Sequence, residues 1–449
     1  MNNNGSANNN NASNAYGVAP FGCFRETGMD SGVAHSETTP DLMIQGGAFR
    51  AWPDGLANSA AARPHAIACG RWQEHGLRAA LSRAMADIDE ITRPEVVLAA
   101  MRDCETGVRW KASTQRFEID ALRWAAGIRK DLLGGTYEAM SFRRFDITER
   151  GKLRHIQAVH IRDRTVQKLI CRHALRPEIR PRLIYDNSAS IEDKGTAFAL
   201  ARLKEHLRWH LARYGKSGVI VIMDYRGFFD SIPHDKAVAA LCAHQSDPLL
   251  RRYIGDMIDA FDGSRGLGLG SEVSQIAAAL YPTPVDRLAK EQLRLHCYAR
   301  YNDDSYFICR DRPEALRCLE AITARAAELG LEIHRAKTKI HNLASDDFTY
   351  LKKRVHITDT GRIVLRLTRA NIRREEARIR LQRAEYDAGR MPLRAILQSY
   401  QCWRSYAQTY DAHEAVRRMD RYFTGIFGDV IQEERGGRVR YGHPEGGRR

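Results

Sequence analysis

The amino-acid sequence predicts a mixed α/β protein built on a small antiparallel sheet with helices around it. Residues 219–223 read VIVIM between a glycine and an aspartate, a pattern typical of a buried central strand. Residues 295–309 hold two apolar pieces around an Asn-Asp-Asp turn, which predicts a β-hairpin. From residue 369 to about 427 the pattern is helical and rich in arginine, which predicts a helical region of its own.

Length and cysteine content restrict the class of protein. The 449 residues are enough for two or three structural units with a sizeable core. No apolar run approaches the ~18 residues needed to cross a membrane, and no basic region followed by an apolar one opens the chain, so we expect neither a membrane span nor a secretory signal. The nine cysteines are odd in number and form no CxxC pair, which argues against a disulfide framework or a zinc site and favours a reducing cytoplasm.

The charge distribution indicates a polyanionic partner. The chain holds 70 Lys plus Arg against 55 Asp plus Glu, a net of +15. Nucleic acid is the commonest partner for such an excess, although a solubilising surface fits net charge alone equally well. Residues 129–216 hold 20 basic and 10 acidic residues, a net of +10. Residues 1–75 hold four Arg and six acids, a net of −2, and their Asn-rich start predicts a disordered tail that is not the nucleic-acid-binding arm.

The remaining elements follow from helical periodicity and turn residues. Helices are expected over residues 74–88, 117–132, 236–244 and 313–329. Glycines directly after the second and fourth of these are plausible helix ends. A Gly-rich turn beginning at residue 266 leads into a helical stretch. Residues 348–367 predict two short strands around the turn Asp359-Thr360-Gly361, and residues 433–449 are expected to fray.

Three carboxylates stand where chemistry could occur. Asp224 follows the buried strand directly, and Asp303 and Asp304 lie in the hairpin turn. Two adjacent aspartates repel each other, and burying them would cost several kcal/mol unless a cation is present. Brought together, the two sites would form an oxygen-only cage of the kind that Mg²⁺ prefers, and two such ions ~3.5–4 Å apart can drive phosphoryl transfer. The alternative is an ordinary turn pair, since Asn and Asp are common in turns.

The residues around these carboxylates resemble, in order and spacing, the motifs of reverse transcriptases, the RNA-directed DNA polymerases. The likeness is to the bacterial group II intron-like and diversity-generating-retroelement-like branch, and to the reverse transcriptase domain only. It covers roughly residues 135–370. The motifs that carry it are GKLR at 151–154, IRDRTVQ at 161–167, DYRGFFDSI at 224–232, GLGLGSEVSQ at 266–275, RYNDD at 300–304, GLEIH at 330–334 with KTK at 337–339, and FTYLK at 348–352.

This resemblance implies a right-hand polymerase of the α/β (α+β) class, with fingers, an antiparallel palm sheet and an α-helical thumb. The implied organisation is a disordered tail at 1–75, an N-terminal helical segment at 76–134, fingers at 135–215, a palm at 216–362, a thumb at 363–428 and a frayed basic tail at 429–449. Two positions depart from the usual pattern of this branch. Ser274-Gln275 replaces the commoner Ser-Pro, and residues 186–196 lack the usual Phe-Arg-Pro-Gly-Arg-Ser element.

The resemblance also assigns roles to residues. Asp224 and Asp303 would bind two Mg²⁺ ions, or Mn²⁺ in their place, with Asp304 as the accompanying acid and the carbonyl of Tyr225 completing the site. The nucleotide-binding residues would be Lys152, Arg154, Phe229, Gln275 and Lys337. The template–primer contacts would be Gly270, Ser271, Tyr301, Arg373, Arg374 and Arg378.

Several of these residues have plainer interpretations. Phe229 would exclude a ribose 2′-OH, but it could also be a core residue. Lys152 and Arg154 would grip the triphosphate, or they could be solvated surface cations. Lys337 would supply a proton to pyrophosphate or simply touch the backbone. The arginines that follow residue 369 would track the primer–template duplex, or they could pair with Glu375 and Glu376 in an ordinary solvated helix.

The function implied is RNA-directed DNA synthesis on an RNA template, from a DNA or RNA primer and dNTPs, without a membrane and with accessory retroelement or defence proteins as further partners. Two alternatives stay open. One is a protein of the same fold that makes untemplated or self-primed DNA in antiphage defence. The other is an RNA-binding scaffold whose polymerase site is vestigial, which the presence of all three aspartates argues against.

Overall fold

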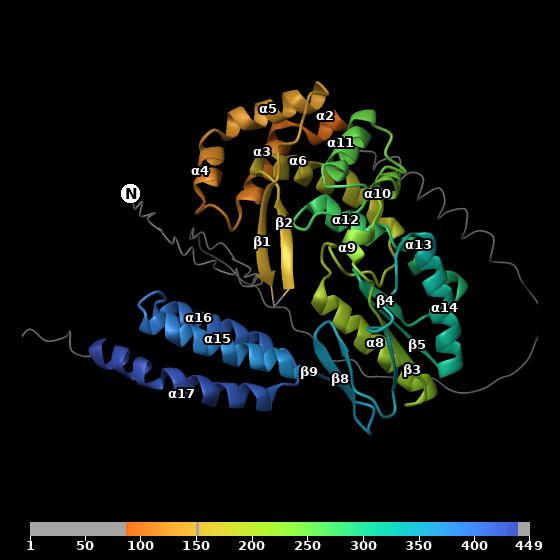
Figure 1. Cartoon of the computed structure of the whole chain (residues 1–449), viewed down its shortest axis with the longest axis vertical. Coiled ribbons are helices and arrows are strands. Elements are labelled where there is room, and N and C mark those ends of the chain that lie inside the picture. The colour runs from red at the N-terminus through yellow and green to blue at the C-terminus, as the bar shows by residue number, and fades with distance from the viewer. Residues whose placement is uncertain (1–86, 150–151, 439–449) are drawn as a thin grey trace, which may run out of the picture. The chain divides into compact units, whose positions relative to one another are not determined.

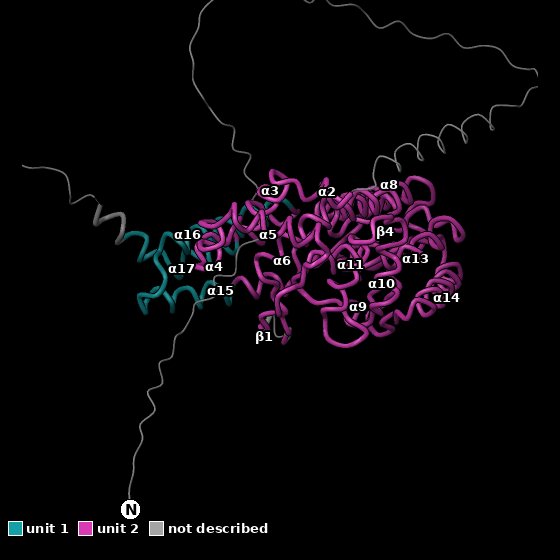
Figure 2. The backbone as a smooth tube through the Cα atoms, turned by 90° about the horizontal axis from the view of Figure 1, so that it is seen from above, with its two compact units in different colours: residues 1–67, 376–409, 418–449 teal, residues 68–375, 410–417 magenta. Residues whose placement is uncertain are grey.

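The computed structural model describes residues 87–149 and 152–438 (Figure 1). Within these ranges the mixed α/β prediction is confirmed, because helices surround three antiparallel sheets. The predicted disordered tail, most of the predicted helix at 74–88 and the end of the chain from residue 439 lie outside the described residues. The described part divides into two compact units, coloured in Figure 2: residues 376–409 with 418–438, and the described residues up to 375 together with 410–417.

The larger unit begins with a set of helices. They are α2 (Ile88–Ile91), α3 (Pro94–Glu105), α4 (Ala112–Ile119), α5 (Ala121–Leu133) and α6 (Ile161–Ile170), followed by η1 (Cys171–Leu175), α7 (Arg176–Ile179) and η2 (Arg180–Arg182). The prediction of one helix over 117–132 is wrong, since Asp120 separates α4 from α5, but α5 ends at Leu133 as the following glycines predicted. Between α5 and α6 a hairpin pairs β1 (Arg143–Glu149) with β2 (Lys152–Ala158).

The central sheet has the strand order β4-β5-β3-β6, with every pair antiparallel. Its strands are β3 (Val219–Met223), β4 (Tyr298–Tyr301), β5 (Asp304–Cys309) and β6 (Lys339–Asn342). The buried strand and the acidic hairpin predicted from the sequence are both confirmed. Successive side chains of β3 face opposite sides. Val219, Val221 and Met223 join one hydrophobic cluster and Ile220 joins the other, which explains why the strand is apolar throughout.

Helices cover both faces of this sheet (Figure 1). On these faces α8 (Thr196–Tyr214) contacts β4, and α14 (Arg312–Glu328) contacts β3 and β5. The other helices of this part of the unit are α9 (Phe228–Ser231), α10 (His234–Leu241), α11 (Pro248–Asp259), α12 (Glu272–Leu280), α13 (Thr283–Arg287) and η3 (Leu288–Gln292). Ile322 of α14 is buried with the first cluster, and Leu203 and Leu207 of α8 are buried with the second. The helix predicted over 313–329 is confirmed as α14. The sheet is therefore the middle layer of the unit.

A third sheet differs from its prediction. Residues 348–367 form three strands, not two: β7 (Phe348–Tyr350), β8 (Lys353–Ile357) and β9 (Ile363–Leu367). The missed turn is Leu351-Lys352, whose φ values of 44° and 62° are both positive. Two-residue hairpin turns with positive φ usually contain Asn and Gly, and neither residue is present here, so the sequence carried no turn signal.

This turn yields a stability prediction. Replacing Leu351→Asn together with Lys352→Gly should raise the free energy of unfolding by about 1–2 kcal/mol, because both new residues tolerate a left-handed backbone. Chemical denaturation of the variant and of the wild type measures the difference. A lower midpoint in the variant would show that contacts of the native side chains outweigh the backbone strain.

The C-terminal helices are α15 (Arg369–Asp387), α16 (Leu393–Gln408) and α17 (His413–Arg438). The helical prediction is confirmed, although α17 continues past the expected end near residue 427. Within the smaller unit Tyr400 stacks on Phe423 at 4.0 Å between ring centroids, and Ile379 and Ile396 are fully buried. No helix in the described ranges is long and apolar enough to cross a membrane.

Candidate active site

The antiparallel register brings the predicted carboxylates to one edge of the central sheet. Met223, the last residue of β3, pairs with Ser305 of β5. The next position along each strand therefore places Asp224 beside Asp304. Tyr301 pairs with Asp304, so Asn302 and Asp303 form a two-residue hairpin loop at the same edge. Asn302 takes the positive φ of 53° that such a loop requires, a backbone conformation that asparagine tolerates well.

The three carboxylates that the strand register brings to this edge act on one another electrostatically. Burial, together with the charges of Asp303 and Asp224, raises the pKa of Asp304 to about 7, while Lys352 and Lys337 oppose the shift. Each negative charge makes the next one harder to form, as expected for carboxylates that share a site. The arrangement therefore concentrates negative charge at the end of β3 and β5.

Lys337 lies directly on this acidic edge. Its Nζ donates to both carboxylate oxygens of Asp224, at 3.1 Å each. The segment before Lys337 runs alongside the start of the Asp224 motif. Tyr225 and Ile333 form an isolated antiparallel β-bridge, and the backbone N–H of His334 donates to the carbonyl of Asp224 at 2.8 Å. The structure thus places the ammonium of Lys337 on the carboxylate of Asp224.

The chemistry of the edge fits a divalent cation. Among the described residues, no three His, Cys, Asp or Glu side chains converge tightly enough to hold a metal ion as they stand. The available donors, however, are carboxylate oxygens, which Mg²⁺ prefers. Burial and the charges of Asp303 and Asp224 disfavour a negative charge on Asp304, and a bound cation would relieve this. Asp224 and Asp303 are the side chains that would hold such an ion, with Asp304 beside them.

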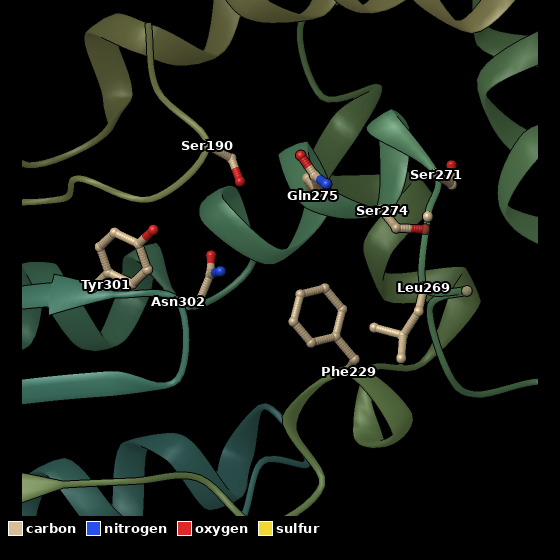
Figure 3. A pocket seen from close by; sticks show the side chains of 10 residues that line it. Ser190, Phe229, Leu269, Ser271, Ser274, Gln275, Tyr301 and Asn302 are labelled. Carbon is tan, nitrogen blue, oxygen red and sulfur yellow. The ribbon is translucent and has the colours of Figure 1, made fainter. Parts of the chain in front are cut away.

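A pocket of about 300 Å³ contains residues of three predicted motifs (Figure 3). Its lining residues are Ser190, Phe229, Gly268, Leu269, Gly270, Ser271, Ser274, Gln275, Tyr301 and Asn302. The structure therefore brings together five predicted site residues, from the motif after Asp224, the Gly-rich motif and the acidic hairpin. In Figure 3 the ring of Phe229 faces the pocket from one wall, and Asn302 and Gln275 lie across from it. Asn302 precedes Asp303, so the pocket and the acidic edge share one turn.

The Gly-rich wall has specific steric reasons for its glycines. A Cβ on Gly268 would lie 2.2 Å from Cε1 of Phe261, and Gly270 has a φ of 104°. Ser271 is buried and its hydroxyl donates to Oε1 of Gln167 at 3.2 Å. The predicted role of Ser271 as a template contact therefore has to operate through its backbone or through a rearranged side chain.

Other predicted site residues are not among those that line the pocket. Lys152 and Arg154 are on β2, where their backbones pair with Glu149 and Ile147. Arg373, Arg374 and Arg378 are exposed on α15. Their roles stay predictions. The side chain of Tyr225 is buried, and only its backbone could take part in the site as predicted.

Sequence reasoning missed two features near the pocket. Ser190 lines it with a left-handed φ of 56°, which no residue pattern indicated. The second is a fully buried ion pair between Arg300 and Asp286. An arginine inside an otherwise apolar strand was the available signal, because such a cation needs a buried acid as its partner.

Comparisons with known proteins bear on the central part of the chain. Residues 144–355 match the family model described as "Reverse transcriptase (RNA-dependent DNA polymerase)". No curated protein matches the chain. Solved structures that resemble part of it include an apo telomerase from Candida tropicalis truncated from its C-terminal domain, at 13% identity and a TM-score of 0.38, with 49% of this chain and 54% of that chain covered.

A second such structure is telomerase from Candida albicans in complex with the TWJ fragment of telomeric RNA. It is 12% identical with a TM-score of 0.40, and the alignment covers 55% of this chain and 49% of that chain. The chain therefore spans about half the length of each of these telomerases.

Proposed function

We propose that the reverse transcriptase domain at residues 144–355 copies an RNA template into DNA by adding dNTPs to the 3′-OH of a primer. The domain is that of an RNA-directed DNA polymerase, and the chain has the α/β right-hand polymerase fold. The observation that carries the proposal is the shared turn: Asn302 lines the pocket while Asp303 and Asp304 stand with Asp224 at the acidic edge.

In the proposed reaction the primer 3′-oxygen forms a bond to the α-phosphorus of the dNTP. The bond from that phosphorus to the bridging oxygen of the β-phosphate breaks, and pyrophosphate leaves. Magnesium bound to Asp224 and Asp303 would neutralise charge on the phosphate groups and make the primer hydroxyl easier to deprotonate. Lys337, whose Nζ contacts Asp224, would donate a proton to the departing pyrophosphate.

The finer assignments belong to the same proposal. Fingers at 135–215 would contribute Lys152 and Arg154 to the triphosphate, a palm at 216–362 would carry the acidic edge, and a thumb at 363–428 would hold the duplex. The bacterial group II intron-like and diversity-generating-retroelement-like branch is proposed with Ser274-Gln275 in place of the commoner Ser-Pro. Accessory retroelement or defence proteins are proposed partners beyond the RNA and the primer.

A primer-extension assay with the full chain tests the function. The substrate is a labelled DNA primer on an RNA template of defined sequence, with Mg²⁺ and the four dNTPs. The expected product has the complement of the template and is absent when the dNTP opposite the first template base is withheld. Products of fixed composition on any template, or without one, would instead support untemplated synthesis. Binding without any product would support the scaffold alternative.

Salt dependence tests where the duplex lies. Residues 364–423 hold 13 Arg, no Lys and seven acids, a net of +6. If this helical region contacts the duplex, neutralising Arg373, Arg374 and Arg378 to Gln should flatten the slope of log affinity against log salt by about 0.9 per lost phosphate contact. Binding should weaken on all sequences, and products should shorten.

Two controls accompany this measurement. Arg312→Gln with Arg317→Gln removes exposed charge from α14 and should leave the slope unchanged. Deleting residues 1–58 should also leave it unchanged, because the net charge of residues 1–75 is −2. If the deletion changes the slope and the α15 substitutions do not, the duplex does not bind at the α15 arginines.

A further inference from the structure

We infer that Arg300 and Asp286 form a positioning pair that holds the acidic turn in register with the pocket-lining helix α12. The inference rests on the proposed function and adds residues that touch neither the nucleotide nor the ions. Both side chains have an exposed fraction of 0%. Arg300 is on β4, one residue before Tyr301, and Asp286 is on α13.

The two side chains are joined by several short contacts. Nε of Arg300 donates to Oδ1 of Asp286 at 2.8 Å, and Nη2 donates to Oδ2 at 2.7 Å. Tyr298, on the same strand, donates its hydroxyl to Oδ1 at 2.7 Å. Two nitrogens of the planar guanidinium thus donate to the two carboxylate oxygens. This bidentate contact fixes the orientation of the arginine side chain as well as its distance from Asp286.

The rest of the guanidinium binds main-chain carbonyls. Nη2 donates to Ala279 at 2.7 Å, and Nη1 lies 3.4 Å from the carbonyls of both Ala278 and Asn302. The two alanines are in the last turn of α12, whose carbonyls lack partners within the helix. For Ala278 the residue four positions on is Pro282, which has no N–H to donate. Arg300 therefore ties the end of α12 to the acidic turn.

These contacts connect the two halves of the site. Ser274 and Gln275 line the pocket from α12, and Tyr301 and Asn302 line it from the hairpin (Figure 3). Asp303 follows Asn302 directly. A shift of the turn relative to α12 would change the pocket width and the position of Asp303 together. Misplacement of reacting groups by about 1 Å can cost roughly 100-fold in rate, so a rigid link at this point matters.

Stability alone does not explain such a pair. The free energy lost when two charges are removed from water offsets much of the free energy gained from their attraction. Apolar replacements of similar volume are therefore often neutral or stabilising. An apolar pair, however, cannot donate hydrogen bonds to the carbonyls of α12 and the acidic turn. The feature that only the ion pair provides is the fixed geometry between these elements.

The first test is Arg300→Lys, which keeps the positive charge beside Asp286 and removes the fork. We expect kcat for single-nucleotide addition to fall about 30- to 100-fold, with KM for the dNTP and the affinity for primer–template changing less than about threefold. The matched control is Arg252→Lys on α11. Its guanidinium likewise contacts a carbonyl, that of Gly135 at 2.8 Å, and a carboxylate, that of Asp256, but lines no part of the pocket. This control should keep wild-type kcat.

The second test is the apolar triple variant Arg300→Met, Asp286→Leu, Tyr298→Phe. It should unfold within about 3 °C of the wild type or above it, while its kcat falls as far as that of Arg300→Lys. Hydrogen exchange should become faster in peptides that cover residues 277–282 and 300–305 in both variants. This readout needs no activity, so it separates the inference from the proposed function.

Each outcome decides the matter. Wild-type kcat in either variant overturns the inference, and so does unchanged hydrogen exchange at the turn. If both variants fail to fold, the pair is structural and the positioning role is wrong. If the wild type itself extends no primer, the proposed function fails, and faster exchange confined to those two segments would still support the link between α12 and the turn.

Discussion

Asparagine in place of Asp224 or Asp303 is expected to abolish primer extension while leaving folding and nucleic-acid binding largely intact. Each change removes one carboxylate charge from the acidic edge and keeps the shape of the side chain, on a backbone that the β3–β5 register and the two-residue loop already define. Loss of such a ligand should cost at least about 2–3 kcal/mol of transition-state stabilisation, which is at least a 30-fold loss of rate. Single-turnover extension of a labelled primer measures it.

Asp359→Asn is the matched control. Asp359 is also an aspartate in a hairpin turn, that between β8 and β9, and it is fully exposed and paired with Lys216. The control should extend primers at the wild-type rate and bind the same primer–template. If Asp224→Asn or Asp303→Asn retained more than about a tenth of wild-type activity, these carboxylates would not be the metal ligands.

The sequence was most informative where a residue pattern is compatible with a single local structure. Residues 219–223 are apolar on both faces, and a strand buried between two helical layers is the arrangement that uses them all. The hairpin at 298–309 was predictable because Asn302 and Asp303 are residues that tolerate a tight turn. Since an aspartate directly follows the buried strand and two aspartates lie at the hairpin turn, the acidic edge followed from the same two patterns once antiparallel pairing was assumed.

The parts that escaped prediction depend on contacts far apart in the chain. Nothing near Asp286 in the sequence indicates that it meets an arginine on β4, because the two residues are brought together only by the tertiary fold. The turn at Leu351-Lys352 lacks turn residues, so tertiary contacts must hold its left-handed backbone. Ser190 likewise reaches the pocket only through the fold of its loop. Local patterns could not have placed any of these residues.

Phe229→Ala is expected to raise incorporation of rNTPs relative to dNTPs by at least about tenfold, equivalent to roughly 1.4 kcal/mol of discrimination. The ring lines the pocket opposite Asn302 and Gln275, and its bulk is what would exclude a ribose 2′-OH (Figure 3). Competition between a dNTP and its matching rNTP for the same template base measures the ratio. Phe229→Tyr keeps the bulk and should keep the wild-type ratio.

The competing interpretation of Phe229 is a core residue, and part of the ring does pack against the main hydrophobic cluster. The two roles give different results. A core residue replaced by alanine would lower the melting temperature and reduce dNTP and rNTP incorporation in proportion, with the ratio unchanged. If Phe229 instead selects the sugar, its loss would change the ratio of rNTP to dNTP incorporation even in variants matched for stability. Without the ring, the pocket would admit ribose and deoxyribose equally. An unchanged ratio in Phe229→Ala would therefore show that Phe229 is a core residue and that another part of the pocket selects the sugar.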